Sequence, residues 1–281
     1  GVVDKDGEDD FGDKTRKDLP APENRGWLLS RHKQYLPNDW ELQFELSYLC
    51  DRNFLEAFFP NEYFAGKEQE TLLYGKKQKD NWAFTALLQY RLNRFQTQTE
   101  SAPELAFYLV GQSIADDKLT LYSENRAGIN RLKLDNALHE QDSDWMARAD
   151  TRQEIDWPNH FGPLNVTPYA VGRLSYWSDA YDAGWMGMPD DGENSRQYGQ
   201  LGIRSNMHFW RVYNDVHSRV WDVDGLKHVI TPEVLAFLGE SVNGVNPDDL
   251  YPMDPGIEQH LGRKSGVGLT LAQRLQTKRG E

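Results

Sequence analysis

Several stretches of this chain are rich in carboxylates, which can act as acids, bases or ligands for a cation. The pairs Asp116-Asp117, Asp190-Asp191 and Asp248-Asp249 could supply an acid and a base, but glycoside hydrolysis needs two carboxyl groups at a defined separation across a cleft. Asp190-Asp191-Gly192-Glu193 and Asp222-Val223-Asp224-Gly225 offer oxygen ligands for a hard cation, yet neither follows the ligand spacing of an EF-hand loop. Solvated loop charges are the simpler interpretation, so we predict no catalytic residue and no metal site.

Histidine, cysteine and glycine patterns indicate no nucleophile or cofactor either. His208, His217 and His228 lie on or near neighbouring predicted strands, but no spacing unites them as ligands. Cys50 is the single cysteine, which excludes an intrachain disulfide. The sequence contains no Gly-rich phosphate loop and no nucleophile elbow. We therefore predict that the protein is not an enzyme and holds no cofactor.

Charge and composition narrow the class of protein further. The net charge of -13 argues against a nucleic-acid binder, which needs basic residues to neutralise phosphates. The 9 Trp, 13 Tyr and 12 Phe residues argue against disorder, which goes with few aromatic residues. No apolar run approaches the ~20 residues of a transmembrane helix, but the strands of a membrane β-barrel give a much weaker signal. Because the sequence starts without Met or a signal peptide, we expect a fragment of a longer chain.

Alternation of apolar and polar residues predicts β-strands along most of the chain. From Trp40 to Tyr48 every second residue is apolar, which is the period of two of a half-buried strand. We expect about ten to twelve antiparallel strands. The predicted strands are residues 25–36, 40–48, 68–77, 81–93, 103–111, 118–128, 145–155, 164–176, 198–214, 227–238 and 264–277.

Short turns and long acidic loops are predicted to alternate between these strands. Residues 51–59 are expected to form a short helical turn capped by Asp51. Short turns on one side and long loops on the other are the plan of an outer-membrane barrel, so the predicted fold class is an all-β antiparallel transmembrane β-barrel, as a fragment of a larger barrel. Residues 1–24 are expected to be an acidic loop or leader, and residues 25–281 a partial barrel domain. Long loops are predicted at residues 129–143, 178–197 and 239–260.

The strand at residues 81–93 predicts which side chains face lipid. Its apolar stripe has an aromatic residue at each end, the order expected where a strand crosses a bilayer and is anchored at both interfaces. The residues predicted to face lipid are Trp82, Phe84, Leu88 and Tyr90. The polar residues predicted to face the lumen, from this strand and two later ones, are Thr85, Gln89, Arg91, Arg173 and Arg204.

Pro168 and Pro232 each fall inside a long predicted strand. Proline lacks the N–H group that a strand ladder uses, and a closed barrel has no free edge at which this loss is harmless. We predict that each proline sits at a bulge, near a strand end or opposite a break in the pairing, with paired residues on both sides of it. The alternative is that the strands begin at these prolines.

Short motifs in a fixed order carry a resemblance to a known family. In chain order they are Cys50-Asp51-Arg52-Asn53-Phe54-Leu55, Gln69-Glu70-Thr71, Pro103-Glu104-Leu105, Arg126 and residues 162–168, 227–232 and 273–278. Over residues 25–278 this order resembles the barrel domain of the LPS-assembly protein LptD family, also called OstA or organic solvent tolerance protein. Cys50 departs from the family's pattern, in which a serine is usual at this position.

The resemblance implies an outer-membrane β-barrel of a Gram-negative-type bacterium that assembles lipopolysaccharide into the outer leaflet. It implies four partners: lipopolysaccharide itself, outer-membrane lipid, an LptE-like lipoprotein that plugs the lumen, and a periplasmic transport bridge. The bridge would be reached through an N-terminal domain that we expect outside this sequence.

A soluble all-β carbohydrate-binding or glycan-cleaving domain is the alternative, suggested by the tryptophan and aspartate content. The two hypotheses differ in where the apolar face of the strands points. A barrel turns it outward to lipid, whereas a sandwich turns it inward against a second sheet.

Overall fold

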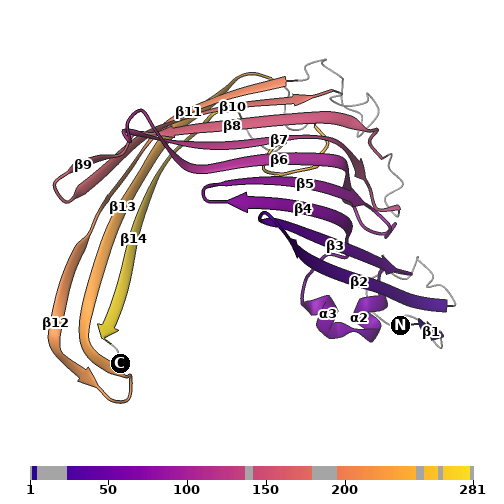
Figure 1. The fold of residues 1–281 in the computed structure, drawn as a ribbon, viewed down its shortest axis with the longest axis horizontal. Helices are drawn as coiled ribbons and strands as arrows, with labels where there is room; N and C mark the ends of the chain where they lie inside the picture. The colour runs from indigo at the N-terminus through magenta and orange to yellow at the C-terminus, as the bar shows by residue number, and fades with distance from the viewer. Residues whose placement is uncertain are drawn as a thin grey trace.

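The computed structural model describes residues 2–4, 24–136, 142–178, 195–244, 250–258 and 262–278. Most of these residues lie in long antiparallel strands that form one curved sheet (Figure 1). The strands are β1 (Val2–Asp4), β2 (Asn24–Leu36), β3 (Trp40–Leu49), β4 (Thr71–Lys79), β5 (Trp82–Tyr90), β6 (Gln98–Ile114), β7 (Leu119–Lys133), β8 (Met146–Asp156), β9 (Asn159–Phe161), β10 (Leu164–Trp177), β11 (Ser195–Met207), β12 (Phe209–Ser218), β13 (Val223–Gly244) and β14 (Lys264–Lys278).

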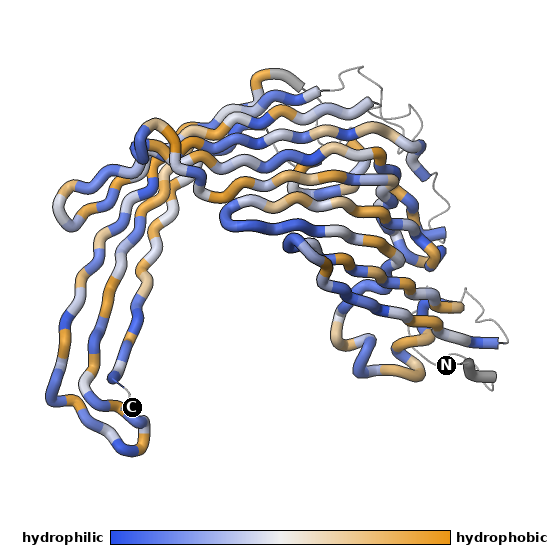
Figure 2. Tube along the Cα trace, in the orientation of Figure 1, coloured by the Kyte–Doolittle hydropathy of each residue, from blue (hydrophilic) through white to orange (hydrophobic). Residues whose placement is uncertain are grey.

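Neighbours in the sequence are neighbours in the sheet from β1 to β8, and each neighbouring pair is antiparallel. The order continues through β10 and β11 to β13, and β9 pairs with the start of β10. Hydrophilic and hydrophobic residues alternate along most of these strands, as Figure 2 shows. Alternation places the two kinds of side chain on opposite faces of the sheet, so its two surfaces differ in chemistry.

β13 is the longest strand and joins three others. Its Glu233–Gly244 half pairs with β11, its Val223–Ile230 half pairs with β12, and β14 pairs along its other edge. β12, β13 and β14 bend away from the rest of the sheet (Figure 1). The single strand predicted at residues 198–214 is therefore two strands, interrupted at His208. The prediction of a loop from residue 239 is wrong over its first residues, because pairing with β11 extends β13 to Gly244.

Two short helices lie between β3 and β4, α2 (Phe54–Phe58) and α3 (Pro60–Phe64). The helical turn predicted here is present, but its N-cap residue is Asn53 and not Asp51, whose carboxylate instead pairs with Arg25 and accepts from the backbone N–H of Asn53. Neither helix of the described residues is long and apolar enough to cross a membrane.

The sheet is open: over the described residues, the edge formed by β1 and β2 does not pair with β14 or β12. The all-β antiparallel class predicted from the sequence is confirmed, whereas a closed barrel is not what these strands form. β7 continues to Lys133, so the loop predicted from residue 129 begins later, because residues 129 and 130 still pair with β8. Most of the predicted leader at residues 1–24 and of the loop at residues 178–197 lies outside the described residues.

Candidate functional site: the polar face of the sheet

Register divides the side chains of the sheet between two faces, because directly paired residues point to the same side. One row crosses six strands through Thr85, Ala106, Arg126, Asp150, Ser175 and Arg196. The adjacent row lies on the opposite side and crosses the same strands through Ala86, Leu105, Ala127, Ala149, Tyr176 and Ser195. The side of the first row is called the polar face here, and the side of the second row the apolar face.

Ion pairs between strands cover the polar face of β8, β10 and β11. Arg204 donates to Glu154 at 2.6 Å and to Asp156 at 3.0 Å. Arg173 donates to Asp150 at 2.9 Å, and both side chains are largely buried. Each carboxylate therefore has a cationic partner, which offsets the cost of removing its charge from water.

The same chemistry extends to the first strands. Lys33 of β2 lies 2.9 Å from Glu41 of β3, and Lys67 lies 2.9 Å from Glu45 of β3. Arg31 approaches Glu45 at 3.3 Å. A surface of paired charges thus runs over the polar face from β2 to β11.

Asp51 lies beside α2 at the end of this surface and accepts hydrogen bonds of 2.8 and 2.7 Å from Arg25. Burial acts to raise the pKa of Asp51, but hydrogen bonds from Arg25 and Cys50 and the charge of Arg25 outweigh it and hold the pKa below its usual value. Burial and the hydrogen bond to Asp51 raise the pKa of the Cys50 thiol. The carboxylate is therefore the charged partner in this cluster.

Residues 250–258, called the strap here, lie across the polar face. Glu258 is only 1 % exposed and Arg148 of β8 only 5 %. Arg148 donates to Glu258 at 2.9 Å and to Glu104 of β6 at 2.7 Å. Trp177 of β10 also donates its indole N–H to Glu258 at 3.2 Å. One carboxylate of the strap is thus held by two strands of the sheet.

Apolar residues complete the contact between the strap and the sheet. They form a buried cluster at the end of the polar face that carries the long connections, made of Leu132, Leu134, Met146, Trp177, Leu250, Tyr251 and Ile257. Arg126 pairs with Asp254, and the hydroxyl of Thr99 donates to the carbonyl of Met253 at 3.1 Å.

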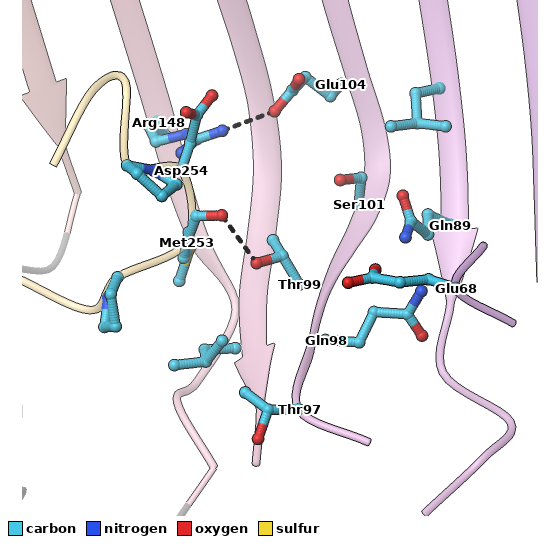
Figure 3. Close-up of a pocket in the computed structure, with 14 residues that line it drawn as sticks. Glu68, Gln89, Thr97, Gln98, Thr99, Ser101, Glu104, Arg148, Met253 and Asp254 are labelled. Carbon is cyan, nitrogen blue, oxygen red and sulfur yellow. Dashed lines mark hydrogen bonds and ion pairs between the residues drawn. The ribbon is translucent and has the colours of Figure 1, made fainter. Parts of the chain in front are cut away.

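A cavity of about 370 Å³ lies between the strap and β5 to β7 (Figure 3). Amide, hydroxyl and carboxylate groups reach it from the strands, and Met253 and Asp254 reach it from the strap. Among its polar lining residues are Glu68, Gln89, Gln98, Thr99, Ser101 and Glu104. The polar face therefore contains a recess lined by polar groups, not only a layer of paired charges.

The apolar face is exposed across the whole sheet. At least one large apolar side chain of each major strand is more than a third exposed there, and Leu269 of β14 is 78 % exposed. One such residue from each of eleven strands is Leu28, Phe44, Leu73, Leu88, Leu105, Ile129, Ile155, Leu174, Leu201, Val234 and Leu269. Monomeric proteins in water rarely expose a contiguous apolar patch of more than ~300–600 Å².

The structure places four of the five predicted lumen residues on the polar face. Thr85 and Gln89 lie on this face of β5, and Arg173 and Arg204 belong to its ion pairs. Arg91 lies beyond the end of β5, where its side chain donates to main-chain carbonyl groups, including that of Gln96 at 3.1 Å.

Both predicted strand prolines lie inside strands. β10 pairs with β9 up to Val166 and with β8 from Tyr169, so Pro168 lies between the two pairings, while β11 pairs with it on the other edge. On β13, pairing with β12 ends at Ile230 and pairing with β11 begins at Glu233, so Pro232 lies at that break. Residues on both sides of each proline are paired.

The residues weighed as catalytic or metal-binding are dispersed. Asp116 and Asp117 form the turn between β6 and β7 with positive φ angles, and Asp222 lies in the turn before β13. His217 lies 2.7 Å from Asp224 at an exposed site. The pairs at residues 190–191 and 248–249 lie outside the described residues. Within the described part of the chain, no group of three or more His, Cys, Asp or Glu side chains could hold a metal ion.

Sequence reasoning missed the strap, which it interpreted as part of a long loop. Arg148 lies among the charged residues that alternate along β8, but its partner Glu258 is 110 residues away. No local pattern relates two residues at this separation, so only folding brings them together.

A comparison with protein families places this arrangement in a known group. The model of a family described as LptD, LPS transport system D, matches residues 23–243, which is more than half of the chain and spans β2 to β13. A comparison with curated proteins found no match. The family is one of transport proteins and not a known enzyme family. The chain therefore belongs to the LptD family and acts in the transport and assembly of lipopolysaccharide at the outer membrane.

Proposed function

We propose that residues 25–281 are part of a transmembrane β-barrel whose apolar face contacts outer-membrane lipid and whose polar face lines the lumen. The observation that carries this proposal is the exposed apolar face, which extends over eleven strands. In a soluble sandwich a second sheet would cover such a face. Over the described residues nothing covers it, which favours lipid as its environment over the carbohydrate-binding alternative.

Aromatic residues at both margins of the apolar face support this orientation. Transmembrane barrels carry belts of aromatic side chains at the two membrane interfaces. At the margin formed by the short turns, the apolar face or the turn itself carries Trp40, Trp82, Trp157 and Trp221. At the opposite margin the apolar face carries Tyr48, Tyr90, Trp145 and Tyr176.

The lengths of the connections between strands support one orientation of the strands across the membrane. Short turns after β2, β4, β6 and β12 lie at one end of the strands, and the longer connections, including α2, α3 and the strap, lie at the other. Bacterial barrels have short periplasmic turns and longer extracellular loops. The strap and the two helices therefore belong to the extracellular end.

Partners follow from this orientation and from the family. The ionic surface from β2 to β11 would contact a lipoprotein that plugs the lumen, and Thr85, Gln89, Arg173 and Arg204 are positioned to reach it or the passing lipopolysaccharide. The periplasmic bridge would deliver lipopolysaccharide at the short-turn end. Arg91, beyond β5, would face the extracellular end of the lumen.

Detergent dependence of the folded state tests the proposal. We expect strand-rich circular dichroism and a monodisperse elution profile in detergent micelles, and aggregation when detergent is removed, because the apolar face then meets water. A folded monomer in buffer without detergent would refute the membrane orientation and revive the soluble alternative.

A further inference from the structure

We propose that the strap, residues 250–258, is a latch that closes the lumen at its long-connection end and leaves the polar face when lipopolysaccharide passes. Arg148 and Glu258 form its lock. This inference rests on the proposed barrel, since it assigns the polar face to the lumen, but it adds a moving part and names the residues that hold it.

The strap is a preformed unit and not an extended tether. The backbone N–H groups of Ile257 and Glu258 both donate to the carbonyl of Asp254 at 2.9 Å, and the Asp254 carboxylate accepts from Gly256 N–H at 2.8 Å. The Asp254 N–H in turn donates to the carboxylate of Glu258. A turn that satisfies its own backbone groups can leave the sheet without unfolding, because it does not expose unpaired donors.

Arg148 has a carboxylate partner whether the strap is closed or open. In the closed position Arg148 binds Glu258 at 2.9 Å and Glu104 at 2.7 Å. When the strap leaves, Glu258 moves into water with it, and Arg148 keeps Glu104. Opening therefore leaves Arg148 paired, which avoids the unpaired buried charge that makes breaking such an ion pair costly. Arg196 of β11 gives up its hydrogen bonds to the carbonyls of Ile257 and Glu258 in the same step.

The cavity beside the strap provides the place where a substrate can act on the latch. Pro252, Met253, Asp254 and Pro255 of the strap form one wall, and β5 to β7 form the others (Figure 3). A molecule that enters the lumen and occupies this space competes with the strap for the polar face. Differential binding of this kind shifts a two-position equilibrium toward the open position.

A reversible disulfide tests whether the strap must move. The pair Thr99→Cys and Met253→Cys joins β6 to the strap, where the Thr99 hydroxyl lies 3.1 Å from the Met253 carbonyl. It is introduced into the whole protein in cells, with Cys50→Ser to remove the thiol of residues 1–281. Surface appearance of newly made lipopolysaccharide is measured after oxidation and again after reduction. We expect oxidation to lower the export rate about tenfold or more, because a latch that opens for each substrate cannot open when tethered, and we expect reduction to restore it.

The matched control is a disulfide between Gln78→Cys and Ala83→Cys, which are directly paired on the polar face of β4 and β5 far from the strap. It joins two strands that do not separate, so export should be unchanged by oxidation. If the oxidised strap variant and the oxidised control variant exported lipopolysaccharide at equal rates, the latch proposal would be overturned. Failure of the strap disulfide to form in an exporting cell would overturn the closed position itself.

Substitution of Glu258 allows a second test, which measures the accessibility of the strap and not the export of lipopolysaccharide. In the Glu258→Gln variant the ion pair with Arg148 is lost, so a cysteine placed at Met253 should react with a membrane-impermeant maleimide at least several-fold faster from outside the cell. Unchanged reactivity would refute the role of Glu258. If the protein folds in water without detergent, the fault lies with the barrel proposal and not with the latch.

Discussion

At the scale of single residues, the position of a side chain within the two-residue period decides its surroundings. Ala86 and Thr85 are consecutive in β5, yet Ala86 pairs with Leu105 on the apolar face and Thr85 with Ala106 on the polar face. A peptide unit separates two environments that differ in polarity and in tolerance of charge.

The first prediction uses this pair. Arginine at Ala86, midway along β5 on the apolar face, should cost about 2–4 kcal/mol of folding free energy, because the guanidinium would sit in the hydrocarbon region. Arginine at Thr85 should cost much less. Urea unfolding in lipid vesicles, monitored by tryptophan fluorescence, compares the two variants, and equal stability of both would contradict the face assignment.

The second prediction concerns the Arg25–Asp51 pair. Because the folded state holds the pKa of Asp51 below its unfolded value, ionised Asp51 stabilises the fold above an unfolded pKa of about 3.9. This contribution is lost as the pH falls through the lower folded pKa. Asp51→Asn should therefore be less stable than the wild type at pH 7, and the difference should shrink below about pH 4. Unfolding curves at several pH values measure it; a difference that persists unchanged at low pH would exclude this carboxylate as the cause.

At the scale of elements, aromatic rings lying over glycines join β10, β11, β13 and β14. Tyr169 covers Gly202, Tyr198 covers Gly239, and Phe237 covers Gly266 across successive strand pairs. A methyl group at Gly202 would meet the Tyr169 ring at 2.4 Å. Glycine is required there because the neighbouring ring occupies the space of a side chain, and such pairs help to fix strand register.

The third prediction compares two glycines of β11. Gly202→Ala should destabilise the protein by about 1–3 kcal/mol, because Tyr169 must leave its hydrogen bond with Gln200 and its stacking with Arg204. Gly199→Ala, on the apolar face of the same strand, has open space around the new methyl group and should be nearly neutral. Thermal unfolding in detergent measures both variants. If Gly199→Ala lowered the stability more than Gly202→Ala, the Tyr169 ring would not be what helps to fix the register of these strands.

At the scale of the whole molecule, the separation of the two faces determines which tryptophans meet lipid. Trp82 lies at a margin of the apolar face, with its ring 6.3 Å from that of Phe107. Trp27 lies on the polar face, with its ring 5.1 Å from that of Phe59. A single sheet thus carries indole rings toward both environments.

The fourth prediction follows from this placement. In vesicles that contain brominated lipid, Trp82→Phe should reduce the quenchable part of the fluorescence, because the indole that is lost contacts the membrane interface. Trp27→Phe should reduce the unquenched part. If Trp27→Phe removed the quenchable signal, the two faces would be reversed and the polar face would not line a lumen.

Local patterns in the sequence were enough to predict the all-β antiparallel class, most strand positions and the family. The family match confirms the predicted role in lipopolysaccharide transport and the outer-membrane location. Alternation is a local property of an extended backbone, so nine residues such as Trp40 to Tyr48 suffice to reveal it. The family motifs are local as well. For the same reason Thr85, Gln89, Arg173 and Arg204 could be assigned to one side of their strands, although what that side faces stays a prediction.

Features that depend on residues far apart in the chain became visible in the folded structure and not before. The break at His208 lies opposite Thr231 and Pro232 of β13. Asn206 pairs with Glu233 and Phe209 with Ile230 in one register, but the proline between them has no N–H for the ladder, and no property of residues 198–214 shows this. The strap lies on the polar face because Glu258 meets Arg148, a residue 110 positions earlier. Contacts of this kind depend on which strands become neighbours in space, and that is set by the pairing of the whole sheet and not by the sequence around either partner.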